Sequence, residues 1–198
     1  VAISATSLYV QDSGTRSLEP VVVVGEVGCT KKSEVPLWLP KVSVVQIEES
    51  TREISLWWHV SNHHFARGGP LISPVIGDLE ELRGDLLFER LRDAFLIGIL
   101  VIMALYHLGI FSQRTKDTTS LWFGLLCLVV AIRQISTSRF IEILSQPASS
   151  AQFETREMLE YGSMIIGLPL AMLFVANLIP GRWIMRVAYS VAVGCCLY

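Results

Sequence analysis

Three histidines and two tryptophans lie close together in the run WWHVSNHH, residues 57–64. Imidazole nitrogens bind a metal ion when several converge on one point, usually with a carboxylate or thiolate partner. His63 and His64 are adjacent, so in an extended strand they would point to opposite faces. We therefore expect no metal site. Aromatic faces suit sugar rings and amides bind hydroxyls, so the run favours a small polar ligand such as a carbohydrate; a packed or half-exposed sheet face stays open as the alternative.

Four residues form the candidate ligand site. Trp57 and His59 project from the same side of a predicted strand, residues 53–60, and Asn62 and Arg67 follow in the connecting loop, where binding residues are often carried. We assign the other side of that strand to the core: Ile54, Leu56, Trp58 and Val60. Asn62 has a second interpretation, as a structural turn residue ahead of a glycine pair.

Catalytic signatures are absent from the sequence, which has no Walker A loop, no GxSxG, no HExxH and no kinase set. We predict that the chain is not an enzyme and needs no cofactor, and that any enzymatic output lies beyond Tyr198. The net charge of −2 gives no basic field, so we expect no nucleic-acid partner. Glu154, Glu157 and Glu160 are spaced by three, and we interpret them as one face of a solvated helix rather than as paired catalytic carboxylates.

The first eighty residues have the turn residues and the polar/apolar alternation of a β domain. Further strands are predicted at residues 7–11, 20–27, 43–49 and 71–77. The short connection at 50–52 predicts a hairpin between 43–49 and 53–60. Short antiparallel strands at this spacing indicate an all-β, jelly-roll-like sandwich. Because about eighty residues are few for a closed sandwich, we expect the domain to be N-terminally incomplete.

From residue 94 the chain becomes apolar. Residues 94–113 carry no formal charge, and at about 1.5 Å per residue such a helix spans the roughly 30 Å hydrocarbon core of a bilayer. Further spans are predicted at 120–137, 161–181 and, incompletely, 183–198. The predicted organisation is a multi-domain membrane protein with a β domain at 1–80, a linker at 81–93 and an α-helical transmembrane bundle at 94–198 in contact with the lipid bilayer.

We single out two polar residues within the complete predicted spans, His107 and Arg133. A charge at mid-bilayer costs at least about 2.5 kcal/mol, so such groups face the bundle interior or extend to the interface. Arg133 lies a few residues from the end of its span, and both placements stay open for it. His107, near the end of the first span, we interpret as structural, with a functional contact as the alternative.

The join between the two parts, residues 78–93, carries leucines at helical spacing among charges. It predicts either a first membrane helix that begins near Asp85, which would couple the β domain to the bundle, or a solvated turn. Charge does not decide the orientation, since the positive-inside rule does not favour an outside β domain.

The order of motifs resembles a bacterial receptor family, the seven-transmembrane receptors with diverse intracellular signalling modules. The matching positions in the β domain are Val60, Ser61, Asn62, Gly68, Gly69, Ile76 and Gly77. The segment from FLIGILVIMALYHLGIF through SLWFGLLCLVVAIRQIST resembles the family's first two helices, and MLEYGSMIIGLPLAMLFVANLIPG resembles the third.

The resemblance implies a jelly roll similar to carbohydrate-binding modules, outside the bacterial cytoplasmic (inner) membrane and ahead of seven helices. It also implies a cytoplasmic output domain, such as a histidine kinase, a nucleotide cyclase or a phosphatase. We therefore predict that the chain is a fragment of a sensor in which ligand binding outside is relayed through the helices. Association into a homodimer stays open. The alternative function is a transporter or a membrane-embedded enzyme with an accessory β domain.

Overall fold

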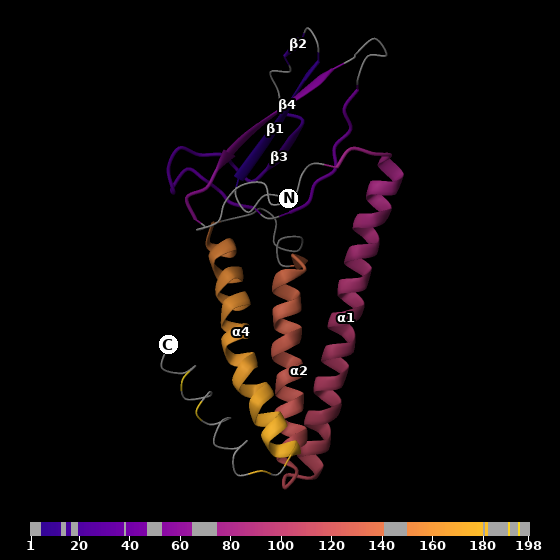
Figure 1. Ribbon diagram of the computed structural model, residues 1–198, viewed down its shortest axis with the longest axis vertical. Coiled ribbons are helices and arrows are strands. Elements are labelled where there is room, and N and C mark those ends of the chain that lie inside the picture. Colours follow the sequence, from indigo (N-terminus) through magenta and orange to yellow (C-terminus); the bar gives the residue numbers. More distant parts are fainter. Residues whose placement is uncertain are drawn as a thin grey trace. The chain divides into compact units, whose positions relative to one another are not determined.

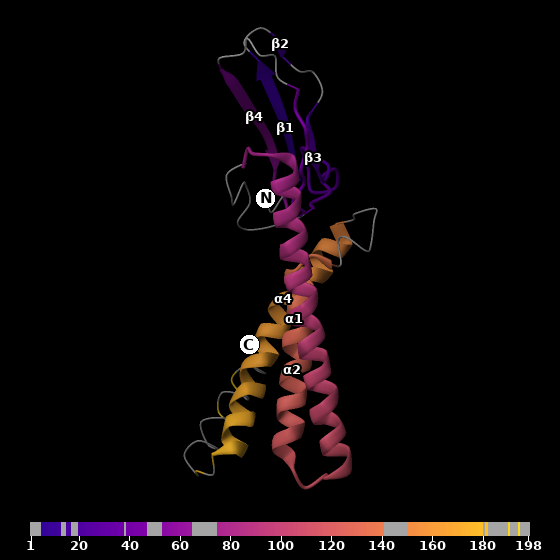
Figure 2. The ribbon, with the colours of Figure 1, turned by 90° about the vertical axis from the view of Figure 1, so that its right-hand side faces the viewer.

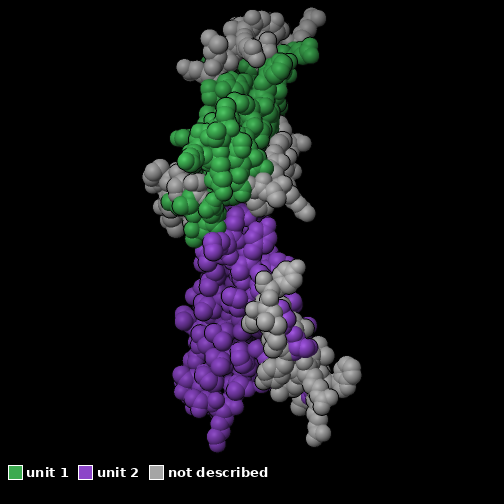
Figure 3. Space-filling model, turned by 90° about the vertical axis from the view of Figure 1, so that its left-hand side faces the viewer, with its two compact units in different colours: residues 1–88, 139–155 green, residues 89–138, 156–198 purple. Residues whose placement is uncertain are grey.

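The computed structural model describes residues 5–12, 15–16, 20–37, 39–46, 53–64, 75–140, 150–179, 181, 190 and 194. Within these residues, four strands are followed by three long helices (Figure 1). The chain divides into two compact units, coloured in Figure 3. Residues 1–88 and 139–155 form the first unit, and residues 89–138 and 156–198 form the second.

The sheet of the first unit is built around its first strand, β1 (Ala5–Asp12). Along one edge β1 pairs over its whole length with β4 (Ile54–Ser61). On its other edge lie β3 (Val22–Val24) and β2 (Thr15–Arg16). All pairings are antiparallel, as the turn residues and the short spacing of the strands predict.

The predicted core side of β4 is confirmed in part. The ladder places Trp58 and Val60 opposite Leu8 and Thr6 of β1, and on this side Thr6 is buried and the two β4 residues are half-buried. Ile54 and Leu56 lie on the same side but are each 38% exposed. At their end of the sheet the strand on the other edge of β1 is the two-residue β2 instead of β3.

Two predicted strands differ from the structure. The hairpin expected between 43–49 and 53–60 is not formed by the described residues, because β4 pairs with β1 and residues 41–46 are not in a strand. Side chains from that segment bond instead to carbonyl groups beside β3: Lys41 Nζ donates to Val23 O at 3.0 Å and Ser43 Oγ to Val21 O at 2.9 Å. Of the strand expected at 71–77, residues 75–77 are not in a strand and the rest lies outside the described residues.

The first helix, α1 (Leu79–Gln113), begins at a capped N-terminus. Asp78 Oδ1 accepts a hydrogen bond of 2.8 Å from the backbone N–H of Glu80, as N-cap residues commonly do. The join is therefore helical rather than a solvated turn. Thirty-five residues rise about 50 Å, longer than the hydrocarbon core, so the charged first turns extend past the apolar stretch that starts at Ala94.

The second helix, α2 (Thr118–Thr137), buries small residues. Its buried side chains are Ser120, Gly124, Cys127, Ala131 and Ser136. Large apolar side chains stay exposed on the neighbouring α1, for example Ile102 at 68% and Leu105 at 66%. Small residues inside and large ones outside are typical of helices that pack in a bilayer, where close backbone approach gives the contact. Figure 2 shows α1 and α2 side by side.

The third described helix, α4 (Ser150–Leu178), contains Pro169 without interruption. It starts well before the predicted span 161–181, since the preceding charged residues also take helical conformation. All three helices are long and apolar enough to cross a membrane. The predicted fourth span, 183–198, lies outside the described residues except for positions 190 and 194.

Candidate functional site

One face of the sheet carries aromatic and polar side chains from two strands. Register pairs Tyr9 of β1 with Trp57 of β4, and Ser7 with His59. Directly opposed residues of an antiparallel pair have their side chains on the same face, so these four share one surface. Trp57 is 52% exposed, His59 is exposed and Tyr9 is half-buried. This surface, which we call the Trp57 face, offers two aromatic side chains and an imidazole to solvent.

Sequence reasoning placed Trp57 and His59 on one side of a strand but missed Tyr9. The alternation in β1 shows that Tyr9 faces away from Leu8, yet only the β1–β4 register shows that it lies opposite Trp57. Asn62 follows β4, is half-buried and takes part in interactions with its surroundings. Arg67 lies outside the described residues, so its place in the ligand site stays a prediction.

The two histidines after β4 bind backbone groups of one turn. His63 Nε2 lies 3.2 Å from Gly28 O, and His64 Nε2 lies 3.0 Å from Lys31 O. A carbonyl oxygen only accepts, so each Nε2 carries the donated proton. Within the described ranges, no group of three or more His, Cys, Asp or Glu side chains is arranged to hold a metal ion.

Glu34 supports the same turn from inside. Its side chain is fully buried, and Oε2 accepts a hydrogen bond of 2.7 Å from the backbone N–H of His63. Val35, the next residue in the chain, forms a β-bridge with Glu26, and this bridge fixes the position of Glu34. Gly25 permits that bridge, since its φ is +71° and a Cβ would lie 2.2 Å from Val35 O. No pattern in the sequence predicts this buried carboxylate, because the turn that carries it is recognisable only in three dimensions.

His107, the first of the predicted intramembrane polar residues, is half-buried among aromatic rings. Its ring lies 4.5 Å from that of Phe123 on α2, edge to face, and the Phe123 ring lies 5.0 Å from that of Phe174 on α4. His107 Nδ1 is buried and has no hydrogen-bond partner in the described part of the chain. The ring therefore contributes to an aromatic contact that includes all three helices.

Arg133, the second of the predicted intramembrane polar residues, is half-buried. The residue after it, Gln134, takes part in a polar contact between α1 and α2. Asp93 of α1 is 8% exposed, and its Oδ1 lies 3.4 Å from Gln134 Nε2 and 3.2 Å from Arg92 Nη2. Asp93 is the last charged residue of α1 before the uncharged run that starts at Ala94. This position could have indicated a polar contact in the sequence, but it was not predicted as one. The polar contact thus lies where the apolar stretch of α1 begins.

Two glutamates of α4 do not lie on the solvated helix face that was predicted for them. Glu157 and Glu160 were expected on a solvated face, but their side chains are only 15% and 22% exposed. They pair with Arg156, which is fully buried: Arg156 Nη2 bonds Glu157 Oε1, and Arg156 Nη1 lies 3.7 Å from Glu160 Oε2. A buried guanidinium requires charged partners, and that requirement brings the two carboxylates inward. Glu154, in contrast, is exposed.

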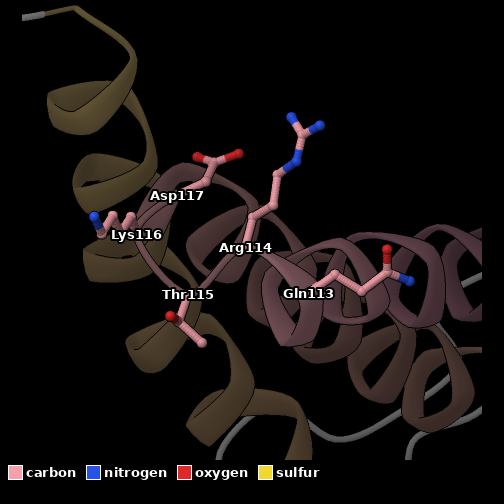
Figure 4. Close-up of a pocket in the computed structure, with 5 residues that line it drawn as sticks. All are labelled: Gln113, Arg114, Thr115, Lys116 and Asp117. Carbon is pink, nitrogen blue, oxygen red and sulfur yellow. The ribbon is translucent and has the colours of Figure 1, made fainter.

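The loop between α1 and α2 borders an open hollow of about 510 Å³, and the residues that line it are drawn in Figure 4. Its lining is five consecutive residues: Gln113, Arg114, Thr115, Lys116 and Asp117. Asp117 precedes α2, and its Oδ2 accepts a hydrogen bond of 2.8 Å from Ser120 Oγ, which lowers the pKa of the carboxyl group. Because one exposed loop supplies the whole lining, this hollow carries no argument for a ligand.

Comparison with known proteins assigns the helical part of the chain. Residues 89–198 match a family model described as 7TM diverse intracellular signalling. That region is more than half of the chain and contains the apolar parts of all three described helices. No curated protein and no solved structure matches the chain. The match indicates a multi-pass membrane protein of a signalling-receptor kind, which is not an enzyme class.

Proposed function

Since the chain belongs to the 7TM diverse intracellular signalling family, we propose that it is the sensing part of a bacterial receptor. In this proposal the β domain lies outside the cytoplasmic membrane and binds a small polar ligand. The helices relay the binding event to an output domain outside these 198 residues. The observation that carries the proposal is the match over 89–198 directly after a β domain with an open aromatic face.

The proposed architecture of the β domain is a jelly roll. Its support is the antiparallel pairing of four strands around β1, with one apolar side and one aromatic and polar side. A sandwich would cover the half-exposed apolar side, where Ile54 and Leu56 are 38% exposed, with a second sheet.

The proposed ligand is a carbohydrate that contacts Trp57, His59, Asn62 and Arg67. Tyr9 extends this set, because it lies opposite Trp57 in the ladder. Two aromatic side chains on neighbouring strands provide an apolar platform for the C–H face of a sugar ring, and His59 offers a hydrogen bond to a hydroxyl at its edge.

The proposed relay uses differential binding. A ligand shifts an equilibrium between two receptor states only by the difference between its affinities for them. The second unit has contacts that two states could exchange, such as the Asp93–Gln134 pair between α1 and α2 and the Thr118–Asn177 hydrogen bond of 2.9 Å between α2 and α4.

The binding proposal is tested on the whole chain in lipid nanodiscs. A glycan array identifies saccharides that bind, and tryptophan fluorescence then measures the affinity of the best one. Trp57→Ala is expected to weaken binding by at least tenfold, since loss of an aromatic platform removes most of the apolar contact. Tyr9→Ala is expected to weaken it less, because Tyr9 is already half-buried.

The matched control is Trp122→Phe, which removes a tryptophan from α2 in the second unit. It should leave the affinity for the saccharide unchanged. The ligand assignment is wrong if no saccharide binds, or if Trp57→Ala binds as tightly as the unaltered chain. A cysteine-accessibility map that places the β domain in the cytoplasm would overturn the orientation.

A further inference from the structure

The turn after β4 is in contact with the N-terminal part of α4 through one exposed carboxylate. Glu154 Oε1 lies 3.4 Å from Lys31 Nζ and 3.4 Å from His64 Nδ1. All three residues belong to the first compact unit. Lys31 and Glu154 are 63% and 56% exposed, whereas the His64 side chain is only 4% exposed.

The hydrogen bonds of His64 make this contact depend on protonation. Nε2 is committed as the donor to Lys31 O at 3.0 Å, because a carbonyl cannot donate in return. In the neutral ring Nδ1 then has only a lone pair, and it faces a carboxylate oxygen. The buried Nδ1 accordingly has no hydrogen-bond partner among the described residues. When a proton is added at Nδ1, the imidazolium of His64 and the carboxylate of Glu154 form an ion pair, in which Nδ1–H is the donor and Oε1 the acceptor.

We propose that His64 and Glu154 form a proton-sensitive contact that joins the end of β4 to the start of α4. When His64 takes one proton from solvent, it donates that proton from Nδ1 in a hydrogen bond to Glu154; while the ring is neutral, only Lys31 holds the carboxylate. The exposed side of Glu154 gives the proton its route to a ring that is otherwise covered.

The other charged groups near His64 support the assignment. His63 precedes it and bonds to Gly28 O through Nε2, and Glu34 lies 3.9 Å from that nitrogen and is fully buried. Glu34 thus faces His63, whereas Glu154 faces His64. The ion pair of Lys31 with Glu154 does not include the His64 ring, so it is present whether or not that ring is protonated. These contacts leave His64 as the group whose charge alters the contact with α4.

The functional consequence is that protons would act on the receptor together with its ligand. His64 follows the strand that carries Trp57 and His59 by only a few residues. A firmer contact at low pH would bind the ligand strand more tightly to α4. This inference goes beyond ligand binding, and its test uses no ligand, so either proposal can fail while the other stands.

The test measures hydrogen exchange of the backbone amides at residues 154–158 in the whole chain in nanodiscs, at about pH 5.5 and about pH 8. These amides are the first in α4 with intrahelical partners. Glu154→Gln is expected to lower the protection of these amides relative to the unaltered chain. After correction for intrinsic exchange, this loss of protection should be severalfold larger at the lower pH. In a His64→Gln background the same substitution should remove equal protection at both pH values.

Lys31→Met is the matched control, because it deletes the other partner of the same carboxylate oxygen. It should lower protection to a similar extent at both pH values. Glu154 is largely exposed, so its variant keeps the fold even if His64→Gln does not. An effect of Glu154→Gln that is the same at both pH values would overturn the proposal. ¹⁵N spectra of the histidine rings that show Nδ1 of His64 unprotonated at the lower pH would overturn it as well.

Discussion

Gly124 of α2 lies so close to Leu108 of α1 that a Cβ atom on the glycine would be 3.0 Å from Leu108 Cγ. It would also lie 3.3 Å from the Ala104 carbonyl oxygen. Ala104 is 1% exposed, so the two helices meet here through their smallest side chains. The contact between α1 and α2 therefore depends on the absence of a side chain at position 124.

Gly124→Val is expected to destabilise the helical unit by about 1–3 kcal/mol, the usual cost of overpacking a filled contact. The measurement is the free energy of unfolding in mixed micelles, followed by circular dichroism. Gly162→Ala is the control, because nothing lies within 4 Å of a Cβ there. It should be neutral or stabilise by up to about 1 kcal/mol, since alanine favours a helix more than glycine does. Equal effects of both substitutions would contradict the close contact.

The Tyr9–Trp57 pair should couple energetically. Directly opposed aromatic pairs on a sheet contribute about 0.2–1 kcal/mol relative to alanine pairs. A double-mutant cycle of Tyr9→Ala and Trp57→Ala, read from hydrogen exchange of the β1 and β4 amides, is expected to give a coupling of that size. The effects of Tyr9→Ala and Trp58→Ala should simply add, because Trp58 faces the other side of β4. A coupling of zero for the first pair would contradict the register.

The hydrogen bond from Thr118 Oγ1 to Asn177 Oδ1, 2.9 Å long, should join α2 to α4. Hydrogen bonds between membrane helices couple by about 0.6 kcal/mol on average. Thr118→Val and Asn177→Leu, measured singly and together by unfolding in micelles, are expected to show a coupling near that value. Thr137→Val serves as a control, because Thr137 Oγ1 bonds only to carbonyls of its own helix. The bond would be refuted if the two substitutions added without coupling.

Asp117 gives the helical unit a dependence on acid. The hydrogen bond from Ser120 lowers the pKa of the Asp117 carboxyl below its ordinary value of about 3.9. A lowered pKa in the folded state means that the ionised form stabilises the fold. This stabilisation is complete above about pH 4 and disappears as the pH falls through the lowered pKa. Ser120→Ala should reduce the loss of stability between about pH 5 and about pH 2, measured by thermal unfolding; an unchanged acid dependence would contradict this role.

The sequence predicted the elements better than their pairings. The strand at 53–60 and the helix at 120–137 are found within two residues of their predicted bounds, because alternation and apolar length are local properties. The partner of β4 was predicted wrongly, since the nearest segment in sequence competes with a distant one and only the folded sheet decides between them. The helix that carries Glu157 ahead of the third span was predicted from the spacing of its glutamates, but the ion pairs with buried Arg156 were not, because burial depends on the neighbouring parts of the fold.

The candidate site shows the same limit. Trp57 and His59 share a face by their spacing alone, and that face is open. Tyr9 joins them only through the register of a strand from the other end of the domain. The contact of His64 with Glu154 joins residues ninety positions apart, which no periodicity in the sequence reveals. Gly124 was not predicted as a contact residue, because a glycine shows its packing role only when the partner helix is in place.

The position of β1 at the centre of the sheet sets an order for biogenesis. Among the described strands β1 is synthesised first, yet its longest neighbour, β4, is synthesised last and comes shortly before α1. The nascent β1 therefore has one full-length edge unpaired until the membrane helix is about to emerge. Unpaired strand edges readily join other chains. A chaperone that covers this edge during translation should consequently raise the yield of folded receptor more than one that assists the helices.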